Sequence, residues 1–180
     1  PGGKSFAAAI RSGENAAITS CDLHENKLKR IRESAARLGL NNICAEARDA
    51  RTYREDWEAA FDLVIADVPC SGLGVIRKKP DIRWKDPADF VGLPVIQKDI
   101  LRNVSRYVAP GGVLLYSTCT LVRKENEGVV EKFLKANPDF SLEKLTLPEN
   151  FPENTTGMLT LVPGEYDTDG FFICRLRRKI

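Results

Sequence analysis

Apolar and polar positions follow one another along the chain in blocks that predict strands and helices in turn. Residues 16–22 form an apolar run that ends in an acidic residue and indicates a buried strand, whereas residues 25–40 carry apolar side chains at helical spacing. Residues 42–50 indicate a second strand. The continuous apolar run 61–67 is typical of a strand covered on both faces.

The second half of the chain continues this alternation and then departs from it. A helix near 95–108 leads through a turn to an apolar strand at 113–119, and residues 124–137 predict the next helix. Two strand patterns, 140–145 and 170–177, are separated by a long polar segment without a helical pattern. We therefore expect an α/β fold with a mostly parallel sheet covered on both faces and an antiparallel terminal strand at its edge.

Composition limits the class of protein. The 180 residues, 43% of them hydrophobic, suffice for one globular domain spanning 1–180. The chain has no run of 18 apolar residues and no signal-peptide pattern, and its five cysteines lack framework spacing. These features predict a cytoplasmic protein in a reducing compartment.

Unusual residues follow several predicted strands at their carboxyl ends, where parallel α/β sheets bind ligands. Asp22, Asp49, the segment from Asp67 to Cys70, and Cys119 all occupy such positions. A single acidic residue there is most often a turn or N-cap residue, but recurrence at four strand ends argues for one shared crevice.

The first strand ends suggest an adenosine-containing cofactor. Gly2 and Gly3 precede a helical pattern in the segment "PGGK", which would let the backbone and the N–H groups of a helix start approach an anionic group. Asp22 is placed to accept hydrogen bonds from ribose hydroxyls, and Asp49 to reach an adenine amino group. The phosphate-loop and dinucleotide motifs are not matched.

The cysteines divide into two groups. Cys21, Cys44 and Cys174 lie inside strand patterns and are expected to be small buried hydrophobic residues. Cys70 and Cys119 stand beyond the ends of apolar runs, so adjacent parallel strands would aim both thiols into one cleft. With one histidine in the chain we expect no metal site, and nucleophilic chemistry fits the thiols better.

Charge adds a modest signal for nucleic acid. The net charge of +2 says little by itself, but residues 76–85 and 174–180 are locally basic. A solvated face is the alternative. Trp84 lies among these charges, and we expect it to pack rather than to stack on a base.

Five segments together carry a family resemblance: "PGGK", "DLHENKLKRIRESAARLGL", "DVPCSGLGVIRKKPDIRW", "YSTCTLVRKENE" and "DGFFICRLRR". They resemble the RNA cytosine-C5 methyltransferases of the NOL1/NOP2/Sun type, over essentially the whole chain. The extension "GLGVIRKKPDIRW" is similar to the Sun subgroup, whose members methylate small-subunit (16S) ribosomal RNA. Val68 replaces the alanine usual in the family. The resemblance implies a Rossmann-like methyltransferase fold.

The resemblance also implies a cofactor and roles for individual residues. S-adenosylmethionine is the implied cofactor, and its implied contacts are Pro1, Gly2, Gly3, Lys4, Asp22, Asp49 and Asp67. Cys119 matches the nucleophile that adds to cytosine C6, Cys70 the residue that assists product release, and Asp67 a residue that positions the base. The expected contacts with an unstacked RNA substrate are Arg77, Lys78, Lys79, Arg83 and Lys85.

Family members carry more sequence upstream, including a first central strand and, in the Sun subgroup, a helical RNA-binding domain. We therefore expect the chain to lack the first strand of its sheet, and the isolated 180 residues to be weakly active or inactive. Three alternatives remain open. They are the same chemistry on transfer RNA, a non-catalytic RNA-binding ribosome-assembly factor, and a cysteine hydrolase, for which the sole histidine, His24, is badly placed.

Overall fold

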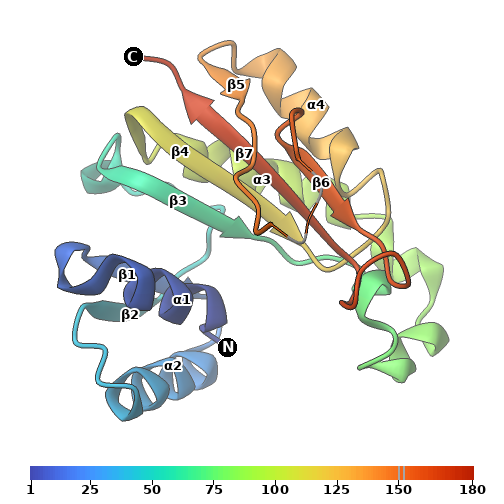
Figure 1. Ribbon diagram of the computed structural model, residues 1–180, viewed down its shortest axis with the longest axis horizontal. Helices are drawn as coiled ribbons and strands as arrows, with labels where there is room; N and C mark the ends of the chain where they lie inside the picture. Colours follow the sequence, from blue (N-terminus) through green and yellow to red (C-terminus); the bar gives the residue numbers. More distant parts are fainter. Residues whose placement is uncertain (150, 152) are drawn as a thin grey trace. The chain divides into compact units, whose positions relative to one another are not determined.

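The computed structural model describes residues 1–149, 151 and 153–180, and the backbone alone at Glu14. The chain divides into two compact units, Pro1–Thr52 and Tyr53–Ile180. Each unit has its own sheet, two-stranded in the first and five-stranded in the second (Figure 1). The expectation of a single domain stays a prediction.

The first unit is a pair of parallel strands with two helices. Its elements are α1 (Gly3–Ser12), a 3-10 turn (Gly13–Asn15), β1 (Ile18–Asp22), α2 (Glu25–Arg37) and β2 (Ile43–Ala47). Strands β1 and β2 run parallel from the pair Ile18↔Ile43 to the pair Asp22↔Ala47. Both strands and the helix between them were predicted from the apolar pattern.

Helix α2 forms because its apolar residues share one face and its end is capped. Leu28, Ile31 and Ala35 are buried. Gly39 adopts a φ of 68° after the last turn, and its N–H donates to the carbonyl of Ala36 while the next N–H reaches that of Ala35. This Schellman arrangement satisfies the final carbonyls and fixes where the helix ends.

The prediction that Cys21 and Cys44 are buried is wrong, since both are exposed. Ser20, which precedes Cys21 on β1, is buried. Its hydroxyl is hydrogen-bonded to that of Ser5 on α1 at 2.8 Å. Side chains alternate between the two faces of a strand. Helix α1 therefore covers the face of Ser20, and the two cysteines point to the other face.

The second unit carries a mixed sheet. Its elements are β3 (Phe61–Asp67), α3 (Leu93–Ser105), β4 (Val108–Thr118), α4 (Glu127–Ala136), β5 (Phe140–Leu142), β6 (Met158–Leu161) and β7 (Phe171–Arg178), with 3-10 turns at Glu55–Trp57, Leu73–Val75, Pro80–Trp84 and Pro87–Phe90. The strand order is β3-β4-β7-β5, and β6 also pairs with β7. β3 and β4 are parallel, whereas β7 is antiparallel to its three neighbours.

Three details of this sheet differ from the prediction. The terminal strand β7 is antiparallel as expected, but it lies inside the sheet rather than at its edge. Strand β6 falls in the polar segment that showed no pattern. Strand β4 begins before the predicted turn, because the chain continues through Gly111, with a φ of 74°, and shifts its register with β3.

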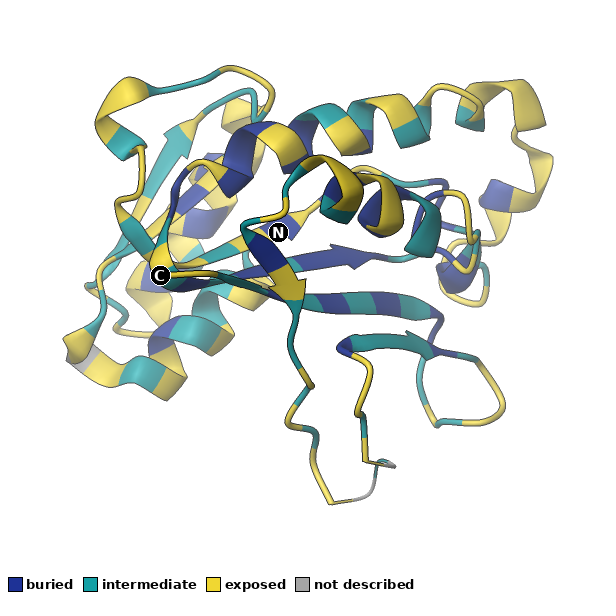
Figure 2. Ribbon diagram, turned by 90° about the horizontal axis from the view of Figure 1, so that it is seen from above, coloured by how far each residue is buried: buried dark blue, intermediate teal, exposed yellow. Residues whose placement is uncertain are grey.

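The core of the second unit lies on one face of the sheet, because alternate residues along β4 and β7 are buried. Figure 2 shows this kind of alternation between buried and intermediate residues along the strands. Tyr116 and Phe172 are fully buried there and meet edge to face, with ring centroids 6.2 Å apart; such pairs contribute about 0.5–1.5 kcal/mol beyond area burial. Cys174 is buried beside them, as predicted. Leu63 and Ile65 of β3 remain 45% and 37% exposed, so the prediction of a strand covered on both faces is wrong.

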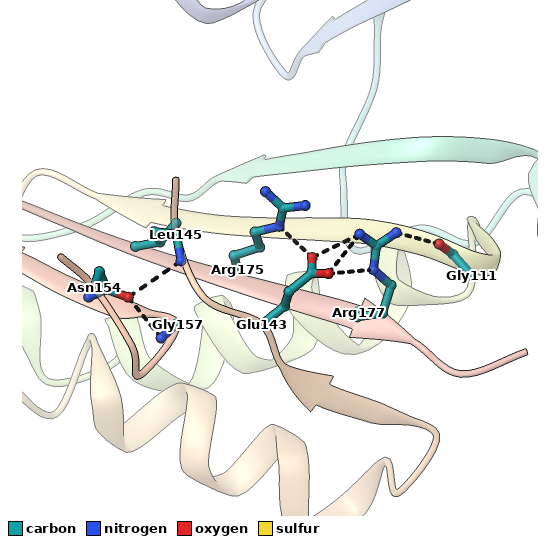
Figure 3. Close-up of polar contacts among 7 residues, drawn as sticks. All are labelled: Gly111, Glu143, Leu145, Asn154, Gly157, Arg175 and Arg177. Atoms are coloured by element: carbon teal, nitrogen blue, oxygen red, sulfur yellow. Dashed lines mark hydrogen bonds and ion pairs between the residues drawn. The ribbon is translucent and has the colours of Figure 1, made fainter. Parts of the chain in front are cut away.

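The connection from β5 to β6 is fastened to β7 by a charged cluster (Figure 3). The carboxylate of Glu143 accepts hydrogen bonds from Arg175 and Arg177, and Arg177 also donates to the carbonyl of Gly111 at 2.6 Å. These arginines lower the pKa of Glu143. The amide oxygen of Asn154 accepts from the N–H of Gly157 and closes the turn before β6.

Candidate active site

The carboxyl ends of β3 and β4 lie side by side, with Asp67 opposite Ser117, and each strand runs into a segment with a cysteine. The Sγ atoms of Cys70 and Cys119 are 3.0 Å apart. The backbone N–H of Cys119 also points at the sulfur of Cys70, at 3.2 Å. The two thiols that the sequence placed at neighbouring strand ends therefore converge.

The two sulfurs differ in acidity because they share a proton. The hydrogen bond from Cys70 lowers the pKa of Cys119 to about 7, against burial, which acts in the opposite direction. The same hydrogen bond and the burial of its thiol raise the pKa of Cys70. At neutral pH, Cys119 is thus the sulfur that becomes a thiolate, and Cys70 keeps the proton. A thiolate is the nucleophilic form of cysteine.

Two further charges act on Cys119. The carboxylate of Asp67 is exposed and accepts a hydrogen bond from the hydroxyl of Ser117 at 3.0 Å; its negative charge raises the pKa of Cys119. The ammonium of Lys79 lowers that pKa. Asp67 and Lys79, both predicted as site residues, therefore lie within electrostatic reach of the reactive sulfur.

A glycine contact that the sequence analysis missed supports the Cys119 loop. The N–H of Gly74 donates to the carbonyl of Cys119 at 3.0 Å, and the N–H of Gly170 donates to the carbonyl of Gly74 at 2.7 Å. A Cβ on Gly74 would lie 2.2 Å from the carbonyl oxygen of Gly170. The glycines in "SGLG" and "DG" were the available signal, but their meeting depends on tertiary structure.

One carboxylate, that of Asp169, pairs with two of the five basic residues that were predicted to contact RNA. Asp169 is buried, and its carboxylate meets Arg77 at 3.3 Å and Lys78 at 2.6 Å, which together lower its pKa, Lys78 most strongly. The other three predicted RNA contacts, Lys79, Arg83 and Lys85, are exposed. The prediction that the neighbouring Trp84 packs is wrong, because its side chain is 84% exposed.

The residues predicted to hold the cofactor's methionine part lie at the start of α1. Gly2 is the N-cap with a φ of 91°, and no side chain caps the helix. A Cβ on Gly3 would meet nothing within 4 Å, so the backbone there faces open space. Pro1 and Lys4 are exposed. A helix start without a side-chain cap and with room in front of it suits a carboxylate.

Asp22 and Asp49 lie at adjoining strand ends of the same unit, where the N–H of Arg48 donates to the carbonyl of Asp22 at 2.9 Å. The half-buried carboxylate of Asp22 accepts from the N–H of His24 at 3.0 Å and meets an exposed lysine. A carboxylate has about four acceptor positions, so room remains for ribose hydroxyls. The guanidinium of Arg51 donates hydrogen bonds to both oxygens of Asp49 and lowers its pKa to about 2.

These three features of the first unit fit a group that carries a carboxylate, a ribose and an adenine. The thiol pair and its surroundings belong to the second unit. Convergence of all four strand ends on one crevice stays a prediction. Among the described residues, no group of three or more His, Cys, Asp or Glu side chains could hold a metal ion. Nor does the described part of the chain contain a helix long and apolar enough to cross a membrane.

Comparisons with known proteins agree on one family. A family model described as "16S rRNA methyltransferase RsmB/F" matches residues 1–177. The chain is 47% identical to a Bacillus subtilis protein named "Probable ribosomal RNA small subunit methyltransferase B", covering 99% of this chain and 41% of that protein. It thus spans about two fifths of the length of such curated relatives.

Solved structures of similar fold point the same way. The crystal structure of PH0851 has a TM-score of 0.91 and 32% identity, over 99% of this chain and 40% of that one. NSun6 from Pyrococcus horikoshii, solved with SFG, has a TM-score of 0.84 and 28% identity, over 99% of this chain and 45% of that one.

Proposed function

The chain belongs to the 16S rRNA methyltransferase RsmB/F family, and on this basis we propose that the protein transfers a methyl group from S-adenosylmethionine to C5 of a cytosine in small-subunit ribosomal RNA. The observation that carries the chemistry is the 3.0 Å approach of the Cys70 and Cys119 sulfurs. Such a substrate agrees with the cytoplasmic location that the sequence predicts.

S-adenosylmethionine supplies an electrophilic methyl group on its sulfonium sulfur. The uncapped start of α1, which is open at Gly3, would hold its carboxylate end, and Asp22 would accept hydrogen bonds from its ribose. Asp49 would approach the adenine while its oxygens remain bonded to Arg51. These roles are supported by the donor and acceptor groups of the first unit.

Cytosine C5 is a poor nucleophile, so the ring must be activated before it can accept a methyl group. The thiolate of Cys119 adds to C6, forming an S–C6 bond and moving the ring electron pair toward C5 and N3. Asp67 accepts a hydrogen bond from the amino group of the base and shares a proton taken up from solvent with N3, which neutralises the negative charge that develops there. Because the pKa of Cys119 is about 7, the reactive form is available at neutral pH.

Release of the product depends on the protonation state of Cys70, which changes once Cys119 has reacted. Once Cys119 is bonded to C6 it is a neutral thioether, so the thiolate that raised the pKa of Cys70 is gone. Cys70 can then give up its proton to solvent and accept the C5 proton, directly or through a base that it positions. The C5–H electron pair forms the C5=C6 double bond, and the C6–S bond breaks to return the thiolate.

RNA reaches this site as an unstacked strand. C5 and C6 are inaccessible in a stacked duplex, so the target cytosine must leave the stack. Lys79, Arg83 and Lys85 are exposed in the segment that follows Cys70 and suit phosphate contacts, and the exposed Trp84 offers a face for stacking.

The test is an adduct assay on the full-length protein with S-adenosylmethionine and small-subunit ribosomal RNA. Cys70→Ala should accumulate a denaturant-resistant protein–RNA adduct, whereas Cys119→Ala should form none and should not methylate. Transfer RNA in place of ribosomal RNA distinguishes the substrate. If neither variant traps RNA and both still methylate, the two-thiol mechanism is wrong.

A cysteine hydrolase is the weaker proposal. It would need a histidine or similar base beside the thiolate. The sole histidine, His24, is exposed and belongs to the first unit, and the unit that carries both thiols has none in its sequence.

A further inference from the structure

Two adjacent residues, Glu125 and Asn126, lie buried beneath both cysteine segments. They are 2% and 1% exposed and belong to the turn between β4 and α4. The sequence pattern placed them inside a helix, but α4 begins after them. Their side chains are therefore directed by the turn and not by a helix face.

Glu125 and its neighbour Gln97 hold the chain on both sides of Cys70. The carboxylate of Glu125 accepts from the backbone N–H of Ser71 at 2.9 Å and from the side-chain amide of Gln97 at 2.9 Å. The same amide donates to the carbonyl of Pro69 at 2.9 Å. The residue after Cys70 is thus fixed directly to one buried carboxylate, and the residue before it is fixed to the same carboxylate through Gln97.

Asn126 does the same for Cys119. Its amide oxygen accepts from the hydroxyl of Thr118 at 2.6 Å, and its amide nitrogen donates to the carbonyl of Thr120 at 2.9 Å. The hydroxyls of Ser71 and Thr120 lie 2.7 Å apart and join the two arrangements. One dipeptide therefore holds the flanking residues of both thiols.

A buried carboxylate is an expensive way to stabilise a turn. Moving such a group out of water costs several kcal/mol unless hydrogen bonds compensate, and apolar residues of similar volume often serve stability as well. The donors that Glu125 meets are neutral, and its own carbonyl accepts from the buried hydroxyl of Tyr116 at 2.6 Å. Hydrogen-bonded networks of buried polar groups rigidify the groups that they join, and here the side-chain oxygen of Gln97 is buried without a hydrogen-bond partner.

We propose that Glu125 and Asn126 are positioning residues that set the separation of Cys70 and Cys119, with Gln97 extending the reach of Glu125 to Pro69. The role in methyl transfer rests on the proposed function. The separation of the thiols does not, because it can be measured without any substrate.

The experiment compares Glu125→Ala, Glu125→Gln and Asn126→Ala in the full-length protein. The first readout is the rate at which diamide, a two-electron oxidant, converts the two thiols to a disulfide with loss of both protons and reduction of diamide to its hydrazine. The second is the pH profile of Cys119 alkylation by iodoacetamide. Misplacing reacting groups by about 1 Å can cost 10²-fold, so we expect Glu125→Ala and Asn126→Ala to slow disulfide formation about tenfold or more.

The alanine variants should also shift the Cys119 alkylation profile to higher pH, because a displaced Cys70 no longer donates to that sulfur. Glu125→Gln keeps an oxygen for the N–H of Ser71 and should recover at least half of the wild-type disulfide rate. Asn103→Ala is the matched control. It removes a buried amide that donates to the hydroxyl of Tyr107 at 3.1 Å, and it should change neither readout.

Folded alanine variants with wild-type disulfide rates and alkylation profiles would overturn the inference. If Glu125→Ala does not fold, Gln97→Met and Asn126→Ala decide together, since the first removes the bond to Pro69 at similar volume and the second removes the bonds on both sides of Cys119. Unchanged disulfide rates in both would refute the positioning role. If the variants alter the thiol readouts while the wild-type protein methylates no RNA, the positioning role stands and the proposed function fails.

Discussion

The sulfurs of Cys70 and Cys119 lie 3.0 Å apart although 49 positions separate the two residues in the chain. At this distance the two sulfurs share one proton through a hydrogen bond. The second deprotonation is opposed by the first negative charge, so the pair holds one thiolate over a wide pH range. Two residues of the same type are thereby given different acidities, as the proposed nucleophile and proton carrier require.

The first prediction concerns pH. Because the hydrogen bond from Cys70 lowers the pKa of Cys119 to about 7, alkylation of Cys119 should accelerate as the pH rises through 7 and then level off. Cys70→Ala removes that bond, and the pKa should return to about 8.5 or above, which reduces the thiolate fraction at pH 7 about fifteenfold. Mass spectrometry of the Cys119 peptide after timed iodoacetamide treatment measures the rate.

Cys44, whose thiol is exposed, serves as the internal reference in that experiment. Its alkylation profile should be the same in both proteins. An unchanged Cys119 profile in Cys70→Ala would show that the two sulfurs do not share a proton in solution.

The second prediction concerns the glycine contact behind Cys119. In Gly74→Ala, the new methyl group would lie 2.2 Å from the carbonyl oxygen of Gly170 and 2.9 Å from that of Cys119. Overpacking of this kind costs about 1–3 kcal/mol and moves the backbone. We expect lower thermal stability together with slower methylation.

Gly92→Ala is the control for Gly74→Ala, because a Cβ there would meet nothing within 4 Å. A stable Gly74→Ala protein with wild-type methylation would contradict the view that this contact supports the Cys119 loop.

The carboxyl ends of the parallel strands could be predicted from the sequence because these strands are continuous apolar runs. Neighbouring runs that both end in cysteine segments implied that Cys70 and Cys119 would meet. Strand β6 could not be found in this way, since its four residues form a strand only by pairing with β7. Its polar surroundings carry no local pattern.

The support beneath the thiols was equally invisible in the sequence. Glu125 and Asn126 fit the period of the helix that follows them, so the pattern assigned them to its first turn. Their true role depends on hydrogen bonds with residues from three other segments. The exposure of Trp84 was missed for a related reason, because an isolated aromatic residue among charges gives no period from which burial can be inferred.

The third prediction compares two basic residues, one of which already pairs with a carboxylate, for their contribution to RNA binding. Both Lys85 and Lys78 are exposed, but Lys78 also meets the carboxylate of Asp169 at 2.6 Å. Each phosphate contact to single-stranded nucleic acid contributes about 0.7 to the slope of log affinity against log salt. Lys85→Ala should reduce that slope by about this amount, and Lys78→Ala by clearly less.

Fluorescence anisotropy with a labelled fragment of small-subunit ribosomal RNA, at several salt concentrations, measures both slopes. The double variant Lys78→Ala with Asp169→Asn tests the reasoning, because it also releases Arg77 from that carboxylate and should show a steeper salt dependence than Lys78→Ala alone. Equal losses for Lys78→Ala and Lys85→Ala would show that Asp169 does not withhold Lys78 from RNA.

The last prediction concerns Asp22. Its carboxylate accepts one backbone hydrogen bond and meets the ammonium of Lys27, and the acceptor positions that are left suit the ribose hydroxyls of the proposed cofactor. Asn at this position retains an oxygen for the N–H of His24 but loses the charge and one acceptor. A hydrogen bond to a charged group contributes about 1.5–3 kcal/mol, so Asp22→Asn should weaken cofactor binding about 10- to 100-fold while stability changes little.

Calorimetric titration with S-adenosylhomocysteine gives the affinity. The matched control is Glu25→Gln, which alters the exposed partner of Arg32 nearby. Wild-type affinity in Asp22→Asn would show that the ribose does not bind at this strand end. The proposal that the first unit binds the cofactor would then fail as well.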